Sequence, residues 1–238
     1  MVKQFAARGH IRVGAIDVPP VHLEHLDADA ELAGRTILIR KAQADFFGGK
    51  ISGSLDAQLV PDPSYQFQGR FDRVDLAQLG QAVPFLDTRI GGTASAVLEL
   101  SAHGIGRQNL NRSLQGQGTI NGKNIELRGF HLGGVFPGAP SDNESDTFAS
   151  VQGTYRIQTV GLDLANFVMD NSTGRLEAEG RIEFSHALNL RVHPSIFQAA
   201  TALASASPPS FILSGTIETP KLVVPSAGPK PAARSGSR

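Results

Sequence analysis

The chain has 238 residues, with 22 basic residues against 22 acidic ones, so its formal net charge is +0. This balance argues against a nucleic-acid-binding protein, which normally carries a basic excess. Gly contributes 26 residues, Pro 14 and aromatic residues only 6%, which predicts many turns and few bulky core side chains. Cysteine is absent, which excludes disulfides, thiolate zinc sites and cysteine nucleophiles.

The N-terminal residues 1–8 lack the apolar stretch of a signal peptide. Nowhere does the sequence contain the run of about 18 apolar residues that a bilayer-spanning helix needs. We therefore expect either a cytosolic protein or a piece of a longer protein. The chain begins within an alternating pattern, which favours the piece.

Apolar and polar residues alternate along most of the chain, which predicts strands with one dry face and one wet face. The alternating stretches are 26–32, 50–59, 65–72, 94–100, 151–157, 175–184 and 211–217. Continuous Val/Ile runs, which are typical of parallel sheets covered on both faces, are missing. The pattern therefore favours an antiparallel sheet.

Turn-forming residues separate these stretches at hairpin distances. They are Gly48-Gly49, Pro61-Asp62-Pro63, Gly91-Gly92, Asn121-Gly122 and residues 171–174. Glycine also recurs inside strand-like segments, at 69–76, 118–125, 215–222 and more weakly at 180–183, where it marks bends or bulges. The predicted fold is all-β, a long and strongly curved antiparallel meander with the shape of a taco or groove.

Two segments break the alternation and predict short helices. Residues 75–83 begin with Asp75 and Gln78 in capping-box spacing and stop at Pro84, whereas residues 194–204 begin with a proline. We expect residues 1–224 to form one curved sheet domain, with a polar loop at 133–146. The Pro/Ala/Gly/Ser-rich tail at 225–238 is predicted to be disordered.

Polar candidate sites are weak. His22 and His25 have a chelating spacing on a helix, but in a strand they point to opposite faces. The cluster Asp142, Asn143, Glu144 and Asp146 lacks the glycine and final glutamate of an EF-hand loop, so we expect a solvated loop. The glycine segments 103–106 and 116–118 lack a strand-then-helix context and are better explained as strand-end glycines. We predict no metal, no cofactor and no enzymatic activity.

The apolar face itself is the remaining candidate, either as the closed core of a sandwich or barrel or as an open hydrophobic groove. Small residues on this face, including Gly53, Gly69, Gly118 and Ala178, leave room for something slender. The candidate groove residues are Ile51, Leu55, Leu59, Phe67, Phe71, Leu98, Leu100, Ile120, Leu176, Ile182, Phe184, Leu213 and Ile217.

From residue 26 to about 224 the chain resembles the C-terminal region of the AsmA-like proteins of diderm bacteria. The resemblance is carried by an aromatic-glycine turn with its following strand, a short helix, two glycine-containing strand pairs and a closing strand. These segments are Ala42–Leu55 with Phe46-Phe47-Gly48-Gly49, Phe71–Leu79, Gly92–Gly106, Leu114–Ile125 and Phe211–Leu222.

The resemblance implies a taco-shaped sheet that bridges the inner and outer membranes and carries phospholipid acyl chains on its apolar interior. It implies a periplasmic protein, tethered to the inner membrane in the full-length family, that contacts phospholipid acyl chains and envelope membrane proteins. Family members begin with an anchoring helix and a longer N-terminal part, so we expect this chain to be a C-terminal piece or a reading frame begun too late. The alternative is a structural or protein-interaction β-scaffold without lipid cargo, whose edge strands pair with a partner.

Overall fold

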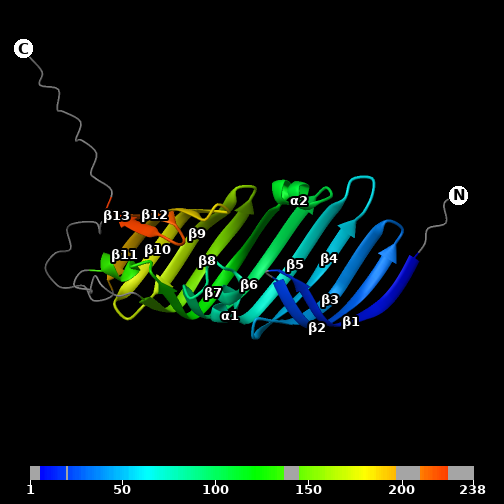
Figure 1. The fold of residues 1–238 in the computed structure, drawn as a ribbon, viewed down its shortest axis with the longest axis horizontal. Coiled ribbons are helices and arrows are strands. Elements are labelled where there is room, and N and C mark those ends of the chain that lie inside the picture. Colours follow the sequence, from blue (N-terminus) through cyan, green and yellow to red (C-terminus); the bar gives the residue numbers. More distant parts are fainter. Residues whose placement is uncertain (1–5, 20, 137–144, 197–209, 225–238) are drawn as a thin grey trace, which may run out of the picture.

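A computed structural model of the protein describes residues 6–19, 21–136, 145–196 and 210–224. These residues form one sheet of 13 strands, hydrogen-bonded in the order of the sequence. Every neighbouring pair is antiparallel. The predicted all-β meander is therefore confirmed, and Figure 1 shows it as a long curved sheet with β1 and β13 at opposite ends.

Most strands are 10 to 14 residues long. Their bounds are β1 Ala6–Val18, β2 Val21–Ala33, β3 Thr36–Phe46, β4 Gly49–Gln58, β5 Ser64–Asp75, β6 Ile90–His103, β7 Gln115–Arg128, β8 Ser145–Gln158, β9 Gly161–Asp170, β10 Gly174–Glu183, β11 Ala187–Ile196, β12 Phe211–Thr216 and β13 Pro220–Val223. The helices are α1 Leu76–Ala82, α2 Arg107–Ser113 and the single 3₁₀ turn η1 Leu132–Val135.

Two of the predicted turns are wrong. Gly91-Gly92 lies inside β6 and Asn121-Gly122 inside β7. Gly92 has a φ of +94° beside a shift in register, so it forms a bulge and not a hairpin. Gly122 is paired on both sides, with Ala94 and with Val151, which leaves the strand no place to turn.

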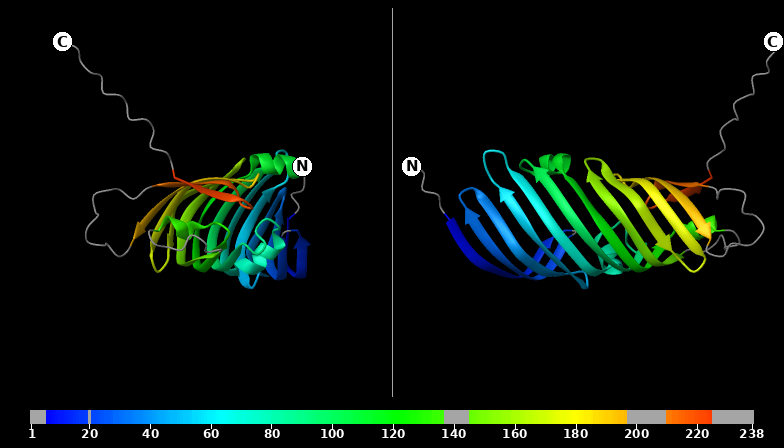
Figure 2. Two further views of the ribbon diagram at one scale, coloured as in Figure 1. Left: turned by 60° about the vertical axis from the view of Figure 1, so that its left-hand side comes forward. Right: turned by 180° about the vertical axis from the view of Figure 1, so that it is seen from behind.

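Bulges give the sheet its curvature. Shifts in register interrupt six of the twelve neighbouring pairs. Each of these shifts contains a non-glycine residue with a positive φ, for example 51° at Lys41 and 50° at Arg73. A bulged strand bends and twists more strongly than a regular one, so these positions roll the sheet into the trough that Figure 2 shows from two further sides.

The helix predicted at residues 75–83 is confirmed as α1, because the Asp75 side chain accepts hydrogen bonds from the Ala77 and Gln78 amides. The helix predicted from Pro194 is wrong at its start, since β11 continues to Ile196. The described residues of β12 pair only with 187–192, so Pro194 lies where β11 has a single neighbour and its missing N–H costs no ladder bond. Residues 197–204 lie outside the described part, as do the tail at 225–238 and most of the loop at 133–146.

Helix α2, at the junction of β6 and β7, was not predicted. It lies at the opposite rim of the sheet from α1, because the two helices follow the ends of antiparallel neighbours (Figure 1). Within the described ranges, no helix is long and apolar enough to cross a membrane.

Candidate functional site

One face of the sheet is apolar from end to end. Following the cross-strand partners from β1 to β13 gives a single row with one residue from each strand. The row is Gly9, Ala30, Ile39, Leu55, Phe67, Leu100, Gly116, Ile157, Leu162, Ile182, Leu188, Gly215 and Pro220. The row contains no polar side chain, so the 13 strands share one continuous dry surface, which we call the apolar trough.

The opposite face carries cross-strand ion pairs. Arg181 Nε lies 2.6 Å from Asp163 Oδ1, and this hydrogen bond lowers the pKa of Asp163. Near the other end, Arg8 Nη2 lies 2.9 Å from Glu31 Oε1. Because alternate residues of each strand face opposite sides, one sheet presents water with charges and keeps its apolar side chains on the inner curve.

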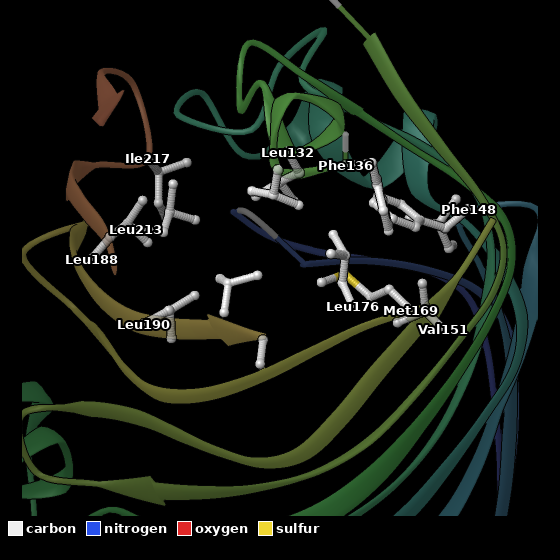
Figure 3. Packing of buried hydrophobic residues seen from close by; sticks show 14 residues of the cluster. Leu132, Phe136, Phe148, Val151, Met169, Leu176, Leu188, Leu190, Leu213 and Ile217 are labelled. Atoms are coloured by element: carbon white, nitrogen blue, oxygen red, sulfur yellow. The ribbon is translucent and has the colours of Figure 1, made fainter. Parts of the chain in front are cut away.

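The trough is filled at its β13 end, which we call the closed end. A cluster of buried side chains from β7 to β12 and η1 occupies the curve there (Figure 3). Leu176 is 0% exposed, and Phe148 and Val192 are 1% exposed. Toward β1 the face loses this cover, and the large side chains Ile39 and Leu55 are only partly buried.

A buried carboxylate holds the inner cover in place. Asp146, only 6% exposed, accepts hydrogen bonds from the Leu132 amide at 2.7 Å and the Gly133 amide at 2.6 Å. These bonds fix η1 so that Leu132 and Phe136 point into the curve, opposite Leu190 in Figure 3. Asp146 was predicted to belong to a solvated loop, but its two amide partners draw it inward to the first residues of β8.

The connection between α1 and β6 fastens the two rims together at the closed end. Arg89 Nη2 donates a hydrogen bond of 2.7 Å to the Glu218 carbonyl, 129 residues away in the sequence. The Phe85 ring lies with its centroid 4.0 Å from that of His186, and His186 Nδ1 lies 2.6 Å from Glu218 Oε1. The first two contacts join the α1–β6 connection to the β12–β13 turn and the β10–β11 turn, and the third joins these two turns to each other, so the trough is bridged there.

Beneath this bridge lies an apolar cavity of about 390 Å³. Tyr155 supplies the only hydroxyl among its 18 lining residues. Burial raises the pKa of Tyr155, and its hydroxyl donates to the Val97 carbonyl at 3.1 Å. Ligand cavities in proteins span roughly 300 to 1,000 Å³, so the space is large enough for part of a hydrocarbon chain.

The structure distributes eleven of the thirteen predicted groove residues over three places. Ile120, Ile182, Leu213 and Ile217 line the cavity, and Leu176 belongs to the packed cluster of the closed end. The partly exposed members lie on the trough face of β4, β5 and β6: Ile51, Leu55, Phe67, Phe71, Leu98 and Leu100.

Two predicted groove residues are misplaced. Strand β4 ends at Gln58 and β10 at Glu183, one residue before Leu59 and Phe184 respectively. Both side chains lie in connections at a rim, 38% and 55% exposed, because the alternation in the sequence continues past the ends of the strands. The alternation along strands does not identify Leu86, Phe130 and Leu132, which line the cavity from connections between strands.

The glycines of the trough leave less room than their size suggests. A Cβ on Gly69 would meet the Phe67 ring, and one on Gly118 would meet the Tyr155 ring. The same holds for Gly153, whose space is taken by Phe167. The expectation that small residues leave space for a ligand is therefore wrong at Gly69 and Gly118, because aromatic side chains of the protein fill it.

The polar candidates do not combine into a site. His22 contacts Asp17 at 3.0 Å, whereas His25 contacts Asp45 at 2.9 Å. Among the residues the structure describes, no three His, Asp or Glu side chains are arranged so that they could hold a metal ion. The glycines at 104 and 106 do lie between a strand and a helix, contrary to expectation, but α2 has only 7 residues.

Comparisons with protein-family models, with curated proteins and with solved structures found no match to this chain.

Proposed function

We propose that this chain is a non-enzymatic protein of the bacterial envelope whose apolar trough shields hydrocarbon, most specifically the acyl chains of phospholipids. In this role it serves phospholipid transport or the assembly and homeostasis of the outer membrane. The observation that carries the proposal is the apolar row through all 13 strands, which leads into the cavity at the closed end.

The lining supports hydrocarbon over other ligands. With one hydroxyl among 18 residues, and that hydroxyl bonded to a backbone carbonyl, the cavity offers few partners to a polar group. A polar group buried there without a hydrogen bond would cost about 1 to 3 kcal/mol. Each methylene buried contributes about 0.8 kcal/mol, so about ten of them gain about 8 kcal/mol before the entropic cost of binding.

The test is lipid retention by matched aspartate variants. Ile120 lines the cavity, whereas Val97, on the neighbouring strand β6, points to the polar face and is 43% exposed. Native mass spectrometry of the chain purified from a diderm host should detect bound phospholipid in the wild type and in Val97→Asp. Ile120→Asp should lose it, because a carboxylate then faces the hydrocarbon.

Far-UV circular dichroism must show that all three proteins are folded. A folded wild type that carries no lipid, and whose melting temperature does not rise with added fatty acid, would overturn the proposal and favour a scaffold without lipid cargo.

A further inference from the structure

Six connections between strands lie along one rim of the trough, the rim that carries α2 (Figure 1). Because antiparallel strands follow one another in the sheet, every second connection returns to the same rim. The six connections are residues 34–35, 59–63, 104–114, 159–160, 184–186 and 217–219. The structure describes the backbone of all six, so this edge, which we call the α2 rim, is continuous from β2 to β13.

Hydrogen bonds join each connection of the α2 rim to the next one. The donors and acceptors are the Leu59 amide and the Arg35 carbonyl at 2.9 Å, the Gly104 amide and the Pro63 carbonyl at 2.8 Å, the Thr159 hydroxyl and the Arg112 carbonyl at 3.2 Å, the Phe184 amide and the Val160 carbonyl at 3.0 Å, and the Ile217 amide and the His186 carbonyl at 3.0 Å. These bonds fix the connections relative to one another, so the α2 rim is one ordered edge and not a set of separate loops.

Large apolar side chains project from four successive connections of this rim. Of the eleven large apolar residues that are exposed in the described part of the chain, five lie here: Leu59, Val60, Ile105, Val160 and Phe184. Ile105 is 72% exposed and lies between Gly104 and Gly106, which have positive φ angles of 92° and 83°. A single exposed apolar residue needs no partner, but its recurrence along one ordered edge indicates a surface that is covered in use.

The spacing of these side chains fits a lipid surface. Neighbouring strands lie about 4.8 Å apart, so successive connections of one rim are about 10 Å apart. Apolar side chains at this distance do not make the contiguous patch that a protein partner buries, but each can enter a bilayer interface separately. The six connections contain three arginines and two carboxylates, of which Glu218 is already paired with His186. Arg35 and Arg112 are exposed, which favours anionic phospholipid headgroups.

From these features we infer that the α2 rim is a membrane-docking edge, which inserts its row of apolar side chains into the surface of a phospholipid bilayer. The apolar face of the sheet borders this rim, so docking places the trough beside a bilayer. The inference goes beyond the proposed function, because docking does not require the cavity to hold lipid.

Flotation with vesicles of equal parts phosphatidylcholine and phosphatidylglycerol tests the rim. The wild type should float with the vesicles. Val60→Asp with Val160→Asp should weaken the binding at least about tenfold, because two side chains lose their place in the interface. The matched control is Val21→Asp with Val97→Asp, at residues 41% and 43% exposed on the opposite rim and on the polar face. It makes the same change in net charge and should bind nearly as well as the wild type.

Tryptophan fluorescence locates the contact, because the chain has no tryptophan of its own. With vesicles, Ile105→Trp should shift its emission to shorter wavelength and be quenched by brominated phospholipid, whereas Val97→Trp should show neither effect. Ile120→Asp, which should lose lipid from the cavity, should still float, so failure of docking and failure of the proposed function are distinguishable.

Far-UV circular dichroism must show that every variant is folded. A folded wild type that does not float, an equal loss in the two double variants, unshifted emission from vesicle-bound Ile105→Trp, or loss of flotation in Ile120→Asp would each overturn the inference.

Discussion

Truncation of Leu176 tests whether the closed end is a packed core. Leu176 is 0% exposed and lies between Met169 and Pro194 in the cross-strand row. Leu176→Ala removes three carbon groups, worth about 2.4 kcal/mol of transfer free energy at about 0.8 kcal/mol each. The cavity left behind adds about 24 cal/mol per Å³, so we expect a loss of about 3 to 5 kcal/mol in the free energy of unfolding.

The matched control is Leu98→Ala, on the uncovered part of the same face. Leu98 is partly exposed, and its cross-strand partners are Gly69 and Gly118, so the substitution leaves no enclosed cavity. Its cost should not exceed about 1.5 kcal/mol.

Urea unfolding followed by far-UV circular dichroism gives both losses in the free energy of unfolding. Amide hydrogen exchange, compared between β9–β11 and β5–β7, shows which part of the sheet each substitution destabilises. Equal costs for the two substitutions would refute the division into a packed end and an uncovered trough.

Three further perturbations probe single contacts. Asp146→Asn replaces one of the two carboxylate oxygens that accept hydrogen bonds from the η1 amides with an NH₂ group. The substitution should lower the free energy of unfolding by about 2 kcal/mol, measured as a lower midpoint in urea. Hydrogen bonding to Asp29 raises the pKa of His10 above its ordinary 6.5, so the stabilisation is complete below that value and is lost as pH rises through the raised pKa. Asp29→Asn should lower the His10 pKa in an NMR titration, and an unchanged midpoint would contradict the contact. Gly118→Val drives a Cβ into a carbonyl oxygen and an aromatic ring and should cost about 2 to 3 kcal/mol, whereas Gly14→Val, with nothing within 4 Å, should be nearly neutral in thermal unfolding.

The face of the sheet on which each strand residue lies was the feature of the fold best predicted from the sequence. The pattern of Ile51, Leu55, Phe67 and Phe71 depends only on the alternation of side chains along each strand, and the structure places all four on the trough face. Local turn chemistry was a poorer guide. Asn121-Gly122 has the composition of a hairpin turn but is paired on both sides, because long-range ladder bonds override a local preference.

The closed end could not be predicted from the sequence. Arg89 and Glu218 are 129 residues apart, and nothing in the local pattern around either residue predicts their hydrogen bond. The same applies to Leu86 and Leu132, which reach the cavity from segments without strand periodicity. Their positions depend on the total curvature of the sheet, which sums the bulges of many strand pairs.

The glycines show why composition alone misjudged the room inside the trough. Glycine removes a side chain from its own position, but it also lets the neighbouring ring lie flat against the backbone, as Phe67 does over Gly69 and Tyr155 over Gly118. Alanine does not open its backbone in this way, because its Cβ keeps the next ring at a distance. The cavity is bordered by Ala96 and Ala178 and also by the Tyr155 and Phe167 rings that cover Gly118 and Gly153, so the number of glycines does not measure its capacity for hydrocarbon.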